Sequence, residues 1–100
     1  MKEEIEADYI KAERAYMQGE YAQAVAIIDL LAEKFPDCPS VHLFRGYIYG
    51  YGLEEYEIAT QEYELVLTLA PHDQDFVNNA LRGTVYNETL LKVRQNQRGR

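Results

Sequence analysis

Apolar residues recur every three or four positions along five separate stretches of the 100-residue chain, and this spacing predicts α-helices. The predicted helices cover about residues 3–18, 21–34, 39–50, 54–69 and 73–96, with fraying expected from about residue 95. No stretch alternates apolar and polar residues over the length of a strand, and no Asn-Gly turn is present. The pattern therefore predicts an all-α fold of five helices in a single domain spanning residues 1–100.

Residues that begin or end helices stand at the borders of these stretches. Gly19 suits the left-handed conformation that closes a helix, and Pro36 and Pro71 cannot continue one because proline lacks a backbone N–H. Asp73 can accept hydrogen bonds from the first free N–H groups of the last helix. These signals predict two helical hairpins followed by one further helix.

The second and fourth predicted helices can be aligned with each other at a spacing of thirty-five residues. The recurring positions are Tyr21 and Tyr56, Ala24 and Ala59, and Pro36 and Pro71. The first helix of each pair keeps a spacing of thirty-four residues, which aligns Ala12 with Gly46, so the second turn contains one extra residue. A period of this size is typical of stacked helical repeats, which present a binding surface instead of a closed catalytic cleft.

The turn sequence Gly19-Glu20-Tyr21, followed by Ala24 and Pro36, resembles the tetratricopeptide repeat. The resemblance covers about residues 5–72 and implies a right-handed superhelical stack of antiparallel hairpins. It implies one repeat at about residues 3–36, a second at about 39–71 and a capping helix at about 73–96. The sequence departs from the family pattern in two ways: Asp8 and His42 stand where the family has a large aromatic residue early in the first helix, and the third unit lacks its second helix. Residues 43–53 are also similar to repeat segments near the start of some bacterial signalling receptors.

The resemblance implies that the exposed faces of the first helices line a concave groove that binds a partner. The implied partner-binding residues are Glu6, Tyr9, Glu13, Tyr16, Met17, Leu43, Tyr47, Gly50, Tyr51, Asn78, Asn79 and Arg82. Some members of the family hold a terminal carboxylate with cations and amides, but Tyr9, Glu13 and Leu43 stand at those places here. An apolar or basic peptide suits a tyrosine-lined acidic groove better. The alternative is that these tyrosines are half-buried packing residues with their hydroxyls in water.

Charge is distributed unevenly along the chain, whose net charge is −7. Residues 1–80 carry a balance of −11, whereas residues 81–100 carry +4. The acidic part disfavours nucleic acid as a partner because it repels phosphates. The basic end either complements the dipole of the last helix or precedes a membrane helix or another domain. No stretch reaches the roughly 18 apolar residues of a membrane helix, so direct membrane insertion is not expected.

Residues with catalytic or metal-binding chemistry do not form a recognisable motif. The single cysteine, Cys38, cannot form an internal disulfide, and this favours a reducing, cytoplasmic location. Asp37 and His42 lie near it, but a structural zinc site needs four ligands and a second pair is missing from the sequence. The chain also lacks a glycine-rich phosphate loop and a serine nucleophile motif. We expect neither enzyme activity nor a cofactor or bound metal.

These observations predict a protein-interaction scaffold that binds a peptide or protein through a tyrosine-rich concave groove, in a bacterial regulatory or signalling assembly. The densest aromatic cluster combines Tyr47, Tyr49 and Tyr51 with neighbouring glycines, and either the main binding contact or a homodimer contact is expected there. The alternative function is a homodimerisation module or the N-terminal segment of a larger signalling receptor. Pairing of exposed ends between two copies favours this alternative.

Overall fold

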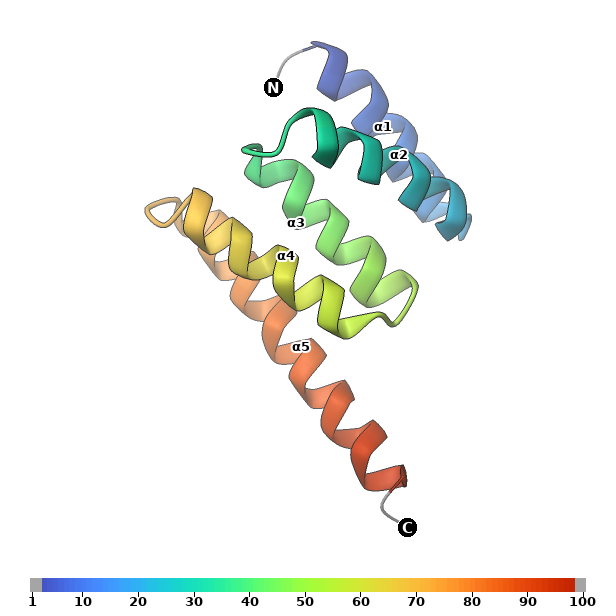
Figure 1. The fold of residues 1–100 in the computed structure, drawn as a ribbon, viewed down its shortest axis with the longest axis vertical. Helices are drawn as coiled ribbons and strands as arrows, with labels where there is room; N and C mark the ends of the chain where they lie inside the picture. The colour runs from blue at the N-terminus through green and yellow to red at the C-terminus, as the bar shows by residue number, and fades with distance from the viewer. Residues whose placement is uncertain (1–2, 99–100) are drawn as a thin grey trace.

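The computed structural model describes residues 3–98, and within this range the chain forms five α-helices, one short π-helical segment and no strand. In chain order the elements are α1 (Glu3–Met17), α2 (Tyr21–Lys34), α3 (Pro39–Tyr47), η1 (Ile48–Gly52), α4 (Tyr56–Leu69) and α5 (Gln74–Arg98). Consecutive helices pack against each other, with α1 at one edge of the array and α5 at the other (Figure 1). The predicted all-α fold with five helices is confirmed for these residues.

The helix ends follow the predicted signals closely. Gly19 has a φ of 78°, and the N–H groups of Gly19 and Glu20 donate to the carbonyls of Tyr16 and Ala15 at 3.0 and 2.9 Å. This pair of bonds closes α1 with a left-handed glycine. At the start of α5, the Asp73 side chain accepts from the N–H groups of residues 75 and 76 at 3.1 and 3.2 Å. The N-cap predicted from the sequence is therefore present.

Two helix ends differ from the prediction. Helix α5 continues to Arg98, although fraying was expected from about residue 95. Its second half contains no glycine or proline between Gly83 and residue 99, so nothing local interrupts it. At the other difference, α3 ends at Tyr47 and the chain continues as the π-helical η1 up to Gly52, instead of turning at residue 50.

The π-helical segment accommodates the one-residue insertion of the second hairpin. In η1 the N–H of Leu53 donates to the carbonyl of Ile48 at 3.0 Å, a spacing of five residues. The closing bond of the first turn, from Glu20 to Ala15, recurs in the second turn from Glu55 to Tyr49 at 2.8 Å. The donors are thirty-five residues apart and the acceptors thirty-four. The extra residue is therefore absorbed within the wider π turn, and the geometry beyond it is preserved.

Backbone angles at the hairpin borders also recur at the thirty-five-residue spacing. The residues before α2 and α4, Glu20 and Glu55, have φ/ψ of −88°/68° and −93°/76°. The residues after these helices, Phe35 and Ala70, have φ/ψ of −130°/68° and −135°/57°. The two hairpins thus share their local conformation although most of their side chains differ.

The core consists of two clusters that meet at α3. The first contains Ile5, Ala12, Ala15, Ala24, Ile28, Leu31, Val41, Phe44 and Ile48. The second contains Leu43, Ala59, Tyr63, Val66 and Ala80. Because α3 contributes to both clusters, it is packed on most sides and leaves only a narrow strip of its surface exposed.

The ring of Tyr63, on α4, is fully buried between two glycines of neighbouring helices. A Cβ on Gly46 of α3 would lie 2.5 Å from Cε1 of this ring, and one on Gly83 of α5 would lie 2.4 Å from Cζ. Within the first hairpin the equivalent residue is the smaller Ile28, which is equally buried. The sequence indicates that Gly83 costs about 1 kcal/mol relative to alanine in a helix. The packing explains why a glycine is nevertheless needed there.

We expect Gly83→Ala to destabilise the protein by about 3 kcal/mol, despite the better helix propensity of alanine, because the new methyl group overlaps the Tyr63 ring. The measurement is urea unfolding followed by circular dichroism. Asn96→Ala, at an exposed position of the same helix, is the control and should leave stability nearly unchanged. Tyr63→Leu should partly rescue Gly83→Ala in a double-mutant cycle. Additive losses would contradict the proposed overlap.

Glu54 occupies the left-handed conformation in the second turn, with a φ of 58°, at the position equivalent to Gly19. Residues with a Cβ are strained there. Glu54→Gly should therefore stabilise the protein by about 0.5–1 kcal/mol, measured by urea unfolding. The control is Glu55→Gly at the neighbouring residue, whose φ is −93°, and this change should destabilise. Equal effects of the two substitutions would contradict strain at Glu54.

Candidate functional site

Two rows of exposed or half-exposed side chains cross α1, α3 with η1, and α5. The rows follow from the repeat spacing, since each contains residues thirty-four and then thirty-five positions apart. One row is Met17, Tyr51 and Tyr86, and the other is Glu13, Tyr47 and Arg82. Successive residues in a row occupy equivalent places on successive first helices. Five of these six residues were predicted to bind a partner, and Tyr86 was not.

Aromatic contacts join the centre of these rows. The rings of Tyr51 and Tyr86 have centroids 4.6 Å apart, and the rings of Tyr47 and Tyr51 are 5.8 Å apart. Tyr51 and Tyr86 remain 39% and 38% exposed, while Tyr47 is half-buried. We call the patch formed by Tyr47, Tyr51 and Tyr86 the tyrosine surface. It presents rigid aromatic area with polar hydroxyls to solvent, which is a common composition of binding surfaces.

The row of Glu13, Tyr47 and Arg82 changes charge from one end to the other. Burial raises the pKa of Tyr47, the nearby Tyr51 adds to this, and the charge of Arg82 acts in the opposite direction. Arg82 is therefore close enough to influence the Tyr47 hydroxyl. Glu13 and Arg82 are both exposed. The tyrosine surface thus has an acidic side chain towards α1 and a cation on α5.

Tyr9 and Tyr16, also predicted to bind a partner, lie half-buried against the same residue of α3. Their ring centroids are 5.0 and 5.7 Å from that of Phe44. Burial, followed by the Glu13 carboxylate, raises the pKa of Tyr9 to about 12. Burial, followed by the neighbouring Tyr21, also raises the pKa of Tyr16. Both phenols therefore stay protonated at neutral pH, and their rings mainly pack α1 against α3.

The structure contradicts the expected exposure of two predicted residues. Leu43 is only 9% exposed and belongs to the core cluster with Tyr63, and Gly50 is buried with its Cα facing Ala59. The reason is that α3 and η1 pack on both α2 and α4, and the side that carries these residues faces α4. Asn78 is exposed, but it lies thirty-five residues after Leu43 and so belongs to the corresponding side of α5, away from the rows.

The remaining predicted residues lie near the rows without aromatic contact to them. Glu6 is exposed on α1, and Asn79 is half-buried on α5. Tyr86 was missed because the last helix was interpreted as a cap with no equivalent positions. Its distance of thirty-five residues from Tyr51 was the available signal.

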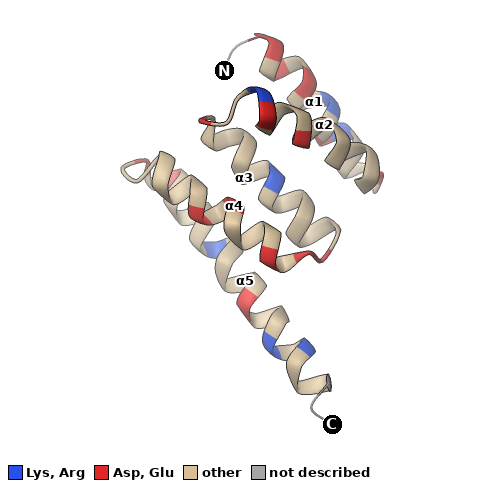
Figure 2. Ribbon diagram, viewed as in Figure 1, with Lys and Arg blue, Asp and Glu red and all other residues tan. Residues whose placement is uncertain are grey.

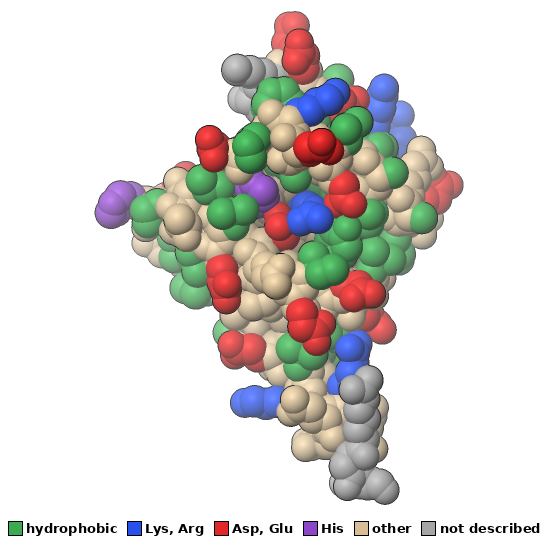
Figure 3. Space-filling view, in the orientation of Figure 1, with side chains coloured by type: hydrophobic (Ala, Val, Ile, Leu, Met, Phe, Trp, Pro, Cys, Tyr) green, Lys and Arg blue, Asp and Glu red, His purple; other side chains and the backbone are tan. Residues whose placement is uncertain are grey.

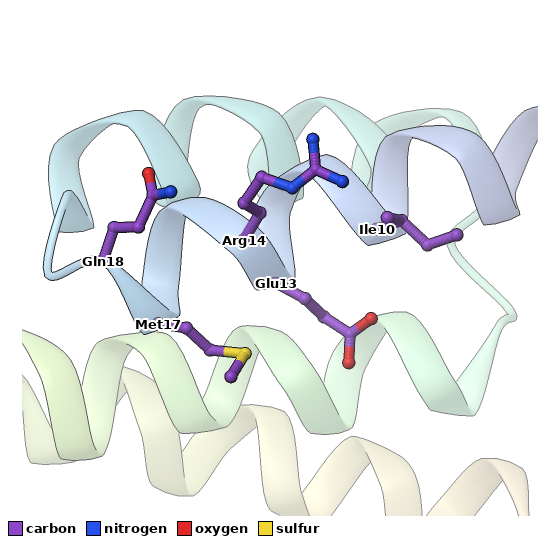
Figure 4. A pocket seen from close by; sticks show the side chains of 5 residues that line it. All are labelled: Ile10, Glu13, Arg14, Met17 and Gln18. Carbon is purple, nitrogen blue, oxygen red and sulfur yellow. The ribbon is translucent and has the colours of Figure 1, made fainter.

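A hollow beside the rows is lined by four residues of α1 and by the residue that follows it: Ile10, Glu13, Arg14, Met17 and Gln18. Figure 4 shows Glu13 and Met17 directed towards the neighbouring helix, with Arg14 and Gln18 directed away from it. Met17 is 83% exposed. A hollow with only one helical wall cannot enclose a small molecule, but an extended polypeptide can lie along it.

Charged residues are distributed over the molecule as the sequence suggested. Figure 2 shows acidic residues on α1, α2 and the turn before α4, and basic residues on the lower half of α5. On the face where α2, α3 and α4 lie in front, acidic side chains are separated by hydrophobic ones (Figure 3). Within the rows themselves the charged members are Glu13 and Arg82.

A second group of polar residues, which we call the charge cluster, joins α2, α3 and α4. Its members are Asp29, His42, Arg45, Tyr49 and Glu62. Arg45 donates from Nε to Asp29 at 2.8 Å and from a terminal nitrogen to Glu62 at 2.6 Å. Tyr49 donates to both oxygens of Asp29 at 3.1 and 3.0 Å. Glu62 is only 7% exposed because it faces His42 and Arg45 on α3.

His42 is the most constrained member of the charge cluster. Its Nε2 lies 2.6 Å from the carbonyl oxygen of Pro36, so this nitrogen must carry a proton. Its Nδ1 lies 2.6 Å from Oε2 of Glu62, and with Glu62 ionised this nitrogen donates as well. The hydrogen bond to Glu62 raises the pKa of His42, against the opposing effect of burial. The residue thus acts as a cation within the helix packing, and neither nitrogen is free to bind a metal.

Within residues 3–98, no group of three or more histidine, cysteine or acidic side chains is arranged to hold a metal ion. Over the same residues, every helix is too short or too polar to span a bilayer. Cys38 is half-buried beside the start of α3 and is not in a disulfide. The rows are the strongest candidate site on this part of the chain.

The raised pKa of His42 makes a specific prediction for stability against pH. A raised folded-state pKa gives stabilisation that is complete below the ordinary value of about 6.5 and is lost as pH rises through the folded pKa. Urea unfolding between roughly pH 6 and 9 should therefore show stability falling with pH, and His42→Gln should flatten this slope. His72→Gln, in the exposed α4–α5 loop, should retain it. An unchanged slope in His42→Gln would exclude the charged histidine.

Comparisons with known proteins give no relative for this chain: no protein-family model matches it, and no curated protein or solved structure matches it. The functional conclusion therefore depends on the geometry of the rows and of the repeat itself.

Proposed function

We propose that this chain is a protein-interaction module that holds an extended segment of a partner polypeptide along the rows of α1, α3 and α5. The observation that carries the proposal is the contact of Tyr51 and Tyr86 at 4.6 Å, with both rings more than one third exposed. Exposed aromatic side chains that support one another lose little conformational freedom when a ligand covers them. Tyrosine is also among the residues that contribute most to binding energy at interfaces.

The proposal includes a tetratricopeptide-like architecture, a right-handed superhelical stack with two repeats and a final capping helix. Three features support it: the recurring backbone angles before and after α2 and α4, the recurring closing hydrogen bonds, and the glycines at close helix contacts. In such an array the first helix of each unit faces a common groove. The rows lie on α1, α3 and α5, which are the first helices of the three units.

The proposed ligand is a peptide with basic and apolar residues. Acidic side chains dominate α1 and the protein carries a net charge of −7, so a basic segment gains from long-range attraction. Arg82 lies at the far end of the row that begins with Glu13, which favours an acidic or polar group of the ligand near α5. The order of charges along the row thus gives the ligand a preferred direction.

The test is selection of peptides from a random library displayed on phage, with the wild-type protein as bait. Selected peptides should bind the Tyr51→Ser, Tyr86→Ser double variant at least roughly tenfold more weakly, because both exposed rings are lost. Binding should also weaken with added salt if the acidic field contributes. Peptide affinities are measured by fluorescence anisotropy.

The matched control is Leu30→Ser, which removes a 50% exposed apolar side chain from α2, outside the rows. It should bind the selected peptides like the wild type. Equal affinities for wild type and for the double tyrosine variant, with helical content unchanged in both, would exclude the tyrosine surface as the binding site.

A further inference from the structure

Helix α5 repeats α3 at a spacing of thirty-five residues, including the connection that precedes it. The N–H of Cys38 donates to the carbonyl of Phe35 at 3.2 Å, and the N–H of Asp73 donates to that of Ala70 at 3.3 Å. One turn later, the N–H groups at positions 42 and 77 donate to the carbonyls of Cys38 and Asp73. Each residue of α5 can therefore be compared with its counterpart on α3.

Helix α3 has one side packed on α2 and another packed on α4. On the α2 side, Arg45 binds Asp29 and Gly52 faces Tyr21. The counterpart of Gly52 on α5 is Asn87, which donates to the side chain of Thr60 and the carbonyl of Tyr56, both on α4. The side of α5 that packs on α4 is thus the equivalent of the side of α3 that packs on α2.

The second packed side of α3 has no covered equivalent on α5. On α3 and η1 this side presents Gly46 and Gly50, both buried against α4. Their counterparts on α5 are Leu81 and Val85, which are 48% and 62% exposed. We call this side of α5, formed by Asn78, Leu81, Val85 and Glu88, the α5 seam. A position that is an interior helix contact in the preceding unit is here apolar and open to solvent.

The opposite end of the array is built differently. Within residues 3–98 no helix precedes α1, so the side of α1 left uncovered among these residues is the equivalent of the α2-facing side of α3. The counterparts of Arg45, Ile48 and Gly52 at a spacing of thirty-four residues are Lys11, Arg14 and Gln18. All three are exposed and polar. A polar outer side is what the end of a helical array needs for solubility. The α5 seam lacks that polar character at its centre.

We propose that the α5 seam binds the α5 seam of a second copy of this chain, with the two helices antiparallel. The seam residues are spaced by three, four and three along the sequence, so they form one stripe on α5. Two helices that pack through such stripes have axes about 8–10 Å apart. Setting Leu81 opposite Val85 of the other copy also sets Asn78 opposite Glu88. The seam is therefore complementary to itself, as a two-fold interface requires.

In this antiparallel arrangement the polar contact is between Asn78 and Glu88, and a hydrogen bond within α5 already orients the amide of Asn78. The side-chain oxygen of Asn78 accepts a hydrogen bond from Nε2 of Gln74 at 2.8 Å. Its amide nitrogen therefore keeps its hydrogens for an acceptor outside the helix, and the carboxylate of Glu88 is such an acceptor. A charge-assisted bond of this type forms twice in a symmetric dimer. The interaction is independent of the tyrosine surface, which lies on a neighbouring side of α5.

Sedimentation equilibrium of the full chain over a dilution series tests the proposal. The mass should rise from the monomer value of 11.6 kDa towards twice that value across roughly 1–500 μM, since one helix pair makes a small interface. The Leu81→Ser, Val85→Ser double variant should stay monomeric over this range, whereas Leu30→Ser on α2 should dimerise like the wild type. A monomeric wild type, or equal dimerisation of the double variant, overturns the proposal.

Disulfide formation tests the antiparallel geometry. In a Cys38→Ser background, Leu81→Cys and Val85→Cys proteins are mixed, one of them carrying a mass tag, and oxidised under mild conditions. Crosslinks between the two different variants should exceed those between identical ones by at least roughly threefold, because position 81 lies opposite position 85. A preference for crosslinks between identical variants overturns this pairing. Helical content and melting temperature of each variant are measured first, so that loss of folding is recognised.

Discussion

The ring of Tyr63 fills the space between α3 and α5, and both helices provide that space with a glycine. Helices can approach to about 8–10 Å only where the contact residues are small, and here one large ring takes up the room that two absent side chains leave. This contact sets the separation of α3 and α5. The separation in turn lets Tyr51 and Tyr86, one from each segment, meet at 4.6 Å on the surface. The geometry of the exposed tyrosine surface thus depends on a residue that solvent never reaches.

The charge cluster joins the first hairpin to the second by a different kind of interaction. Asp29, Arg45 and Glu62 come from α2, α3 and α4, and Glu62 is the most deeply buried, with 9% of its side chain exposed against 24% for Arg45 and 40% for Asp29. Buried ion pairs add little net stability because their desolvation is costly, but an uncompensated buried charge costs about 3–5 kcal/mol. The main contribution of the charge cluster is therefore to fix the relative alignment of α2, α3 and α4, and its net contribution to stability is small. Tyr63 specifies the spacing of α3, α4 and α5, so the two contacts together define the order of the array.

Local signals were sufficient to predict the helices from the sequence. Gly19, Pro36, Pro71 and Asp73 act through their own backbone chemistry, and such effects need no tertiary information. The one-residue insertion of the second hairpin was also visible as a change of spacing, although its accommodation by a π turn was not. The π turn depends on the surrounding contacts of η1, which keep the closing bond of Glu55 in place.

Side-chain exposure was predicted less well because it depends on which helices flank a residue. Leu43 and Gly50 were expected at the surface and are buried. Leu43 and Gly50 face α4, the other helix of their own hairpin, whereas the repeat assignment had placed them on the side of the groove. Tyr86 was missed for the related reason that α5 was considered only as a cap. The spacing of thirty-five residues from Tyr51 would have placed Tyr86 correctly.

The two ends of the array differ in a way that bears on how the surfaces could work together. The α1 end is polar, whereas α5 carries Arg82 and Tyr86 on one side and Leu81 and Val85 on the adjacent side. Occupation of one side therefore leaves the other open. A pair of chains joined through α5 would present two tyrosine surfaces at a fixed separation. Two weak contacts with one long partner, or with two partners that are themselves linked, then act with a high effective concentration, and modest individual affinities suffice for stable capture.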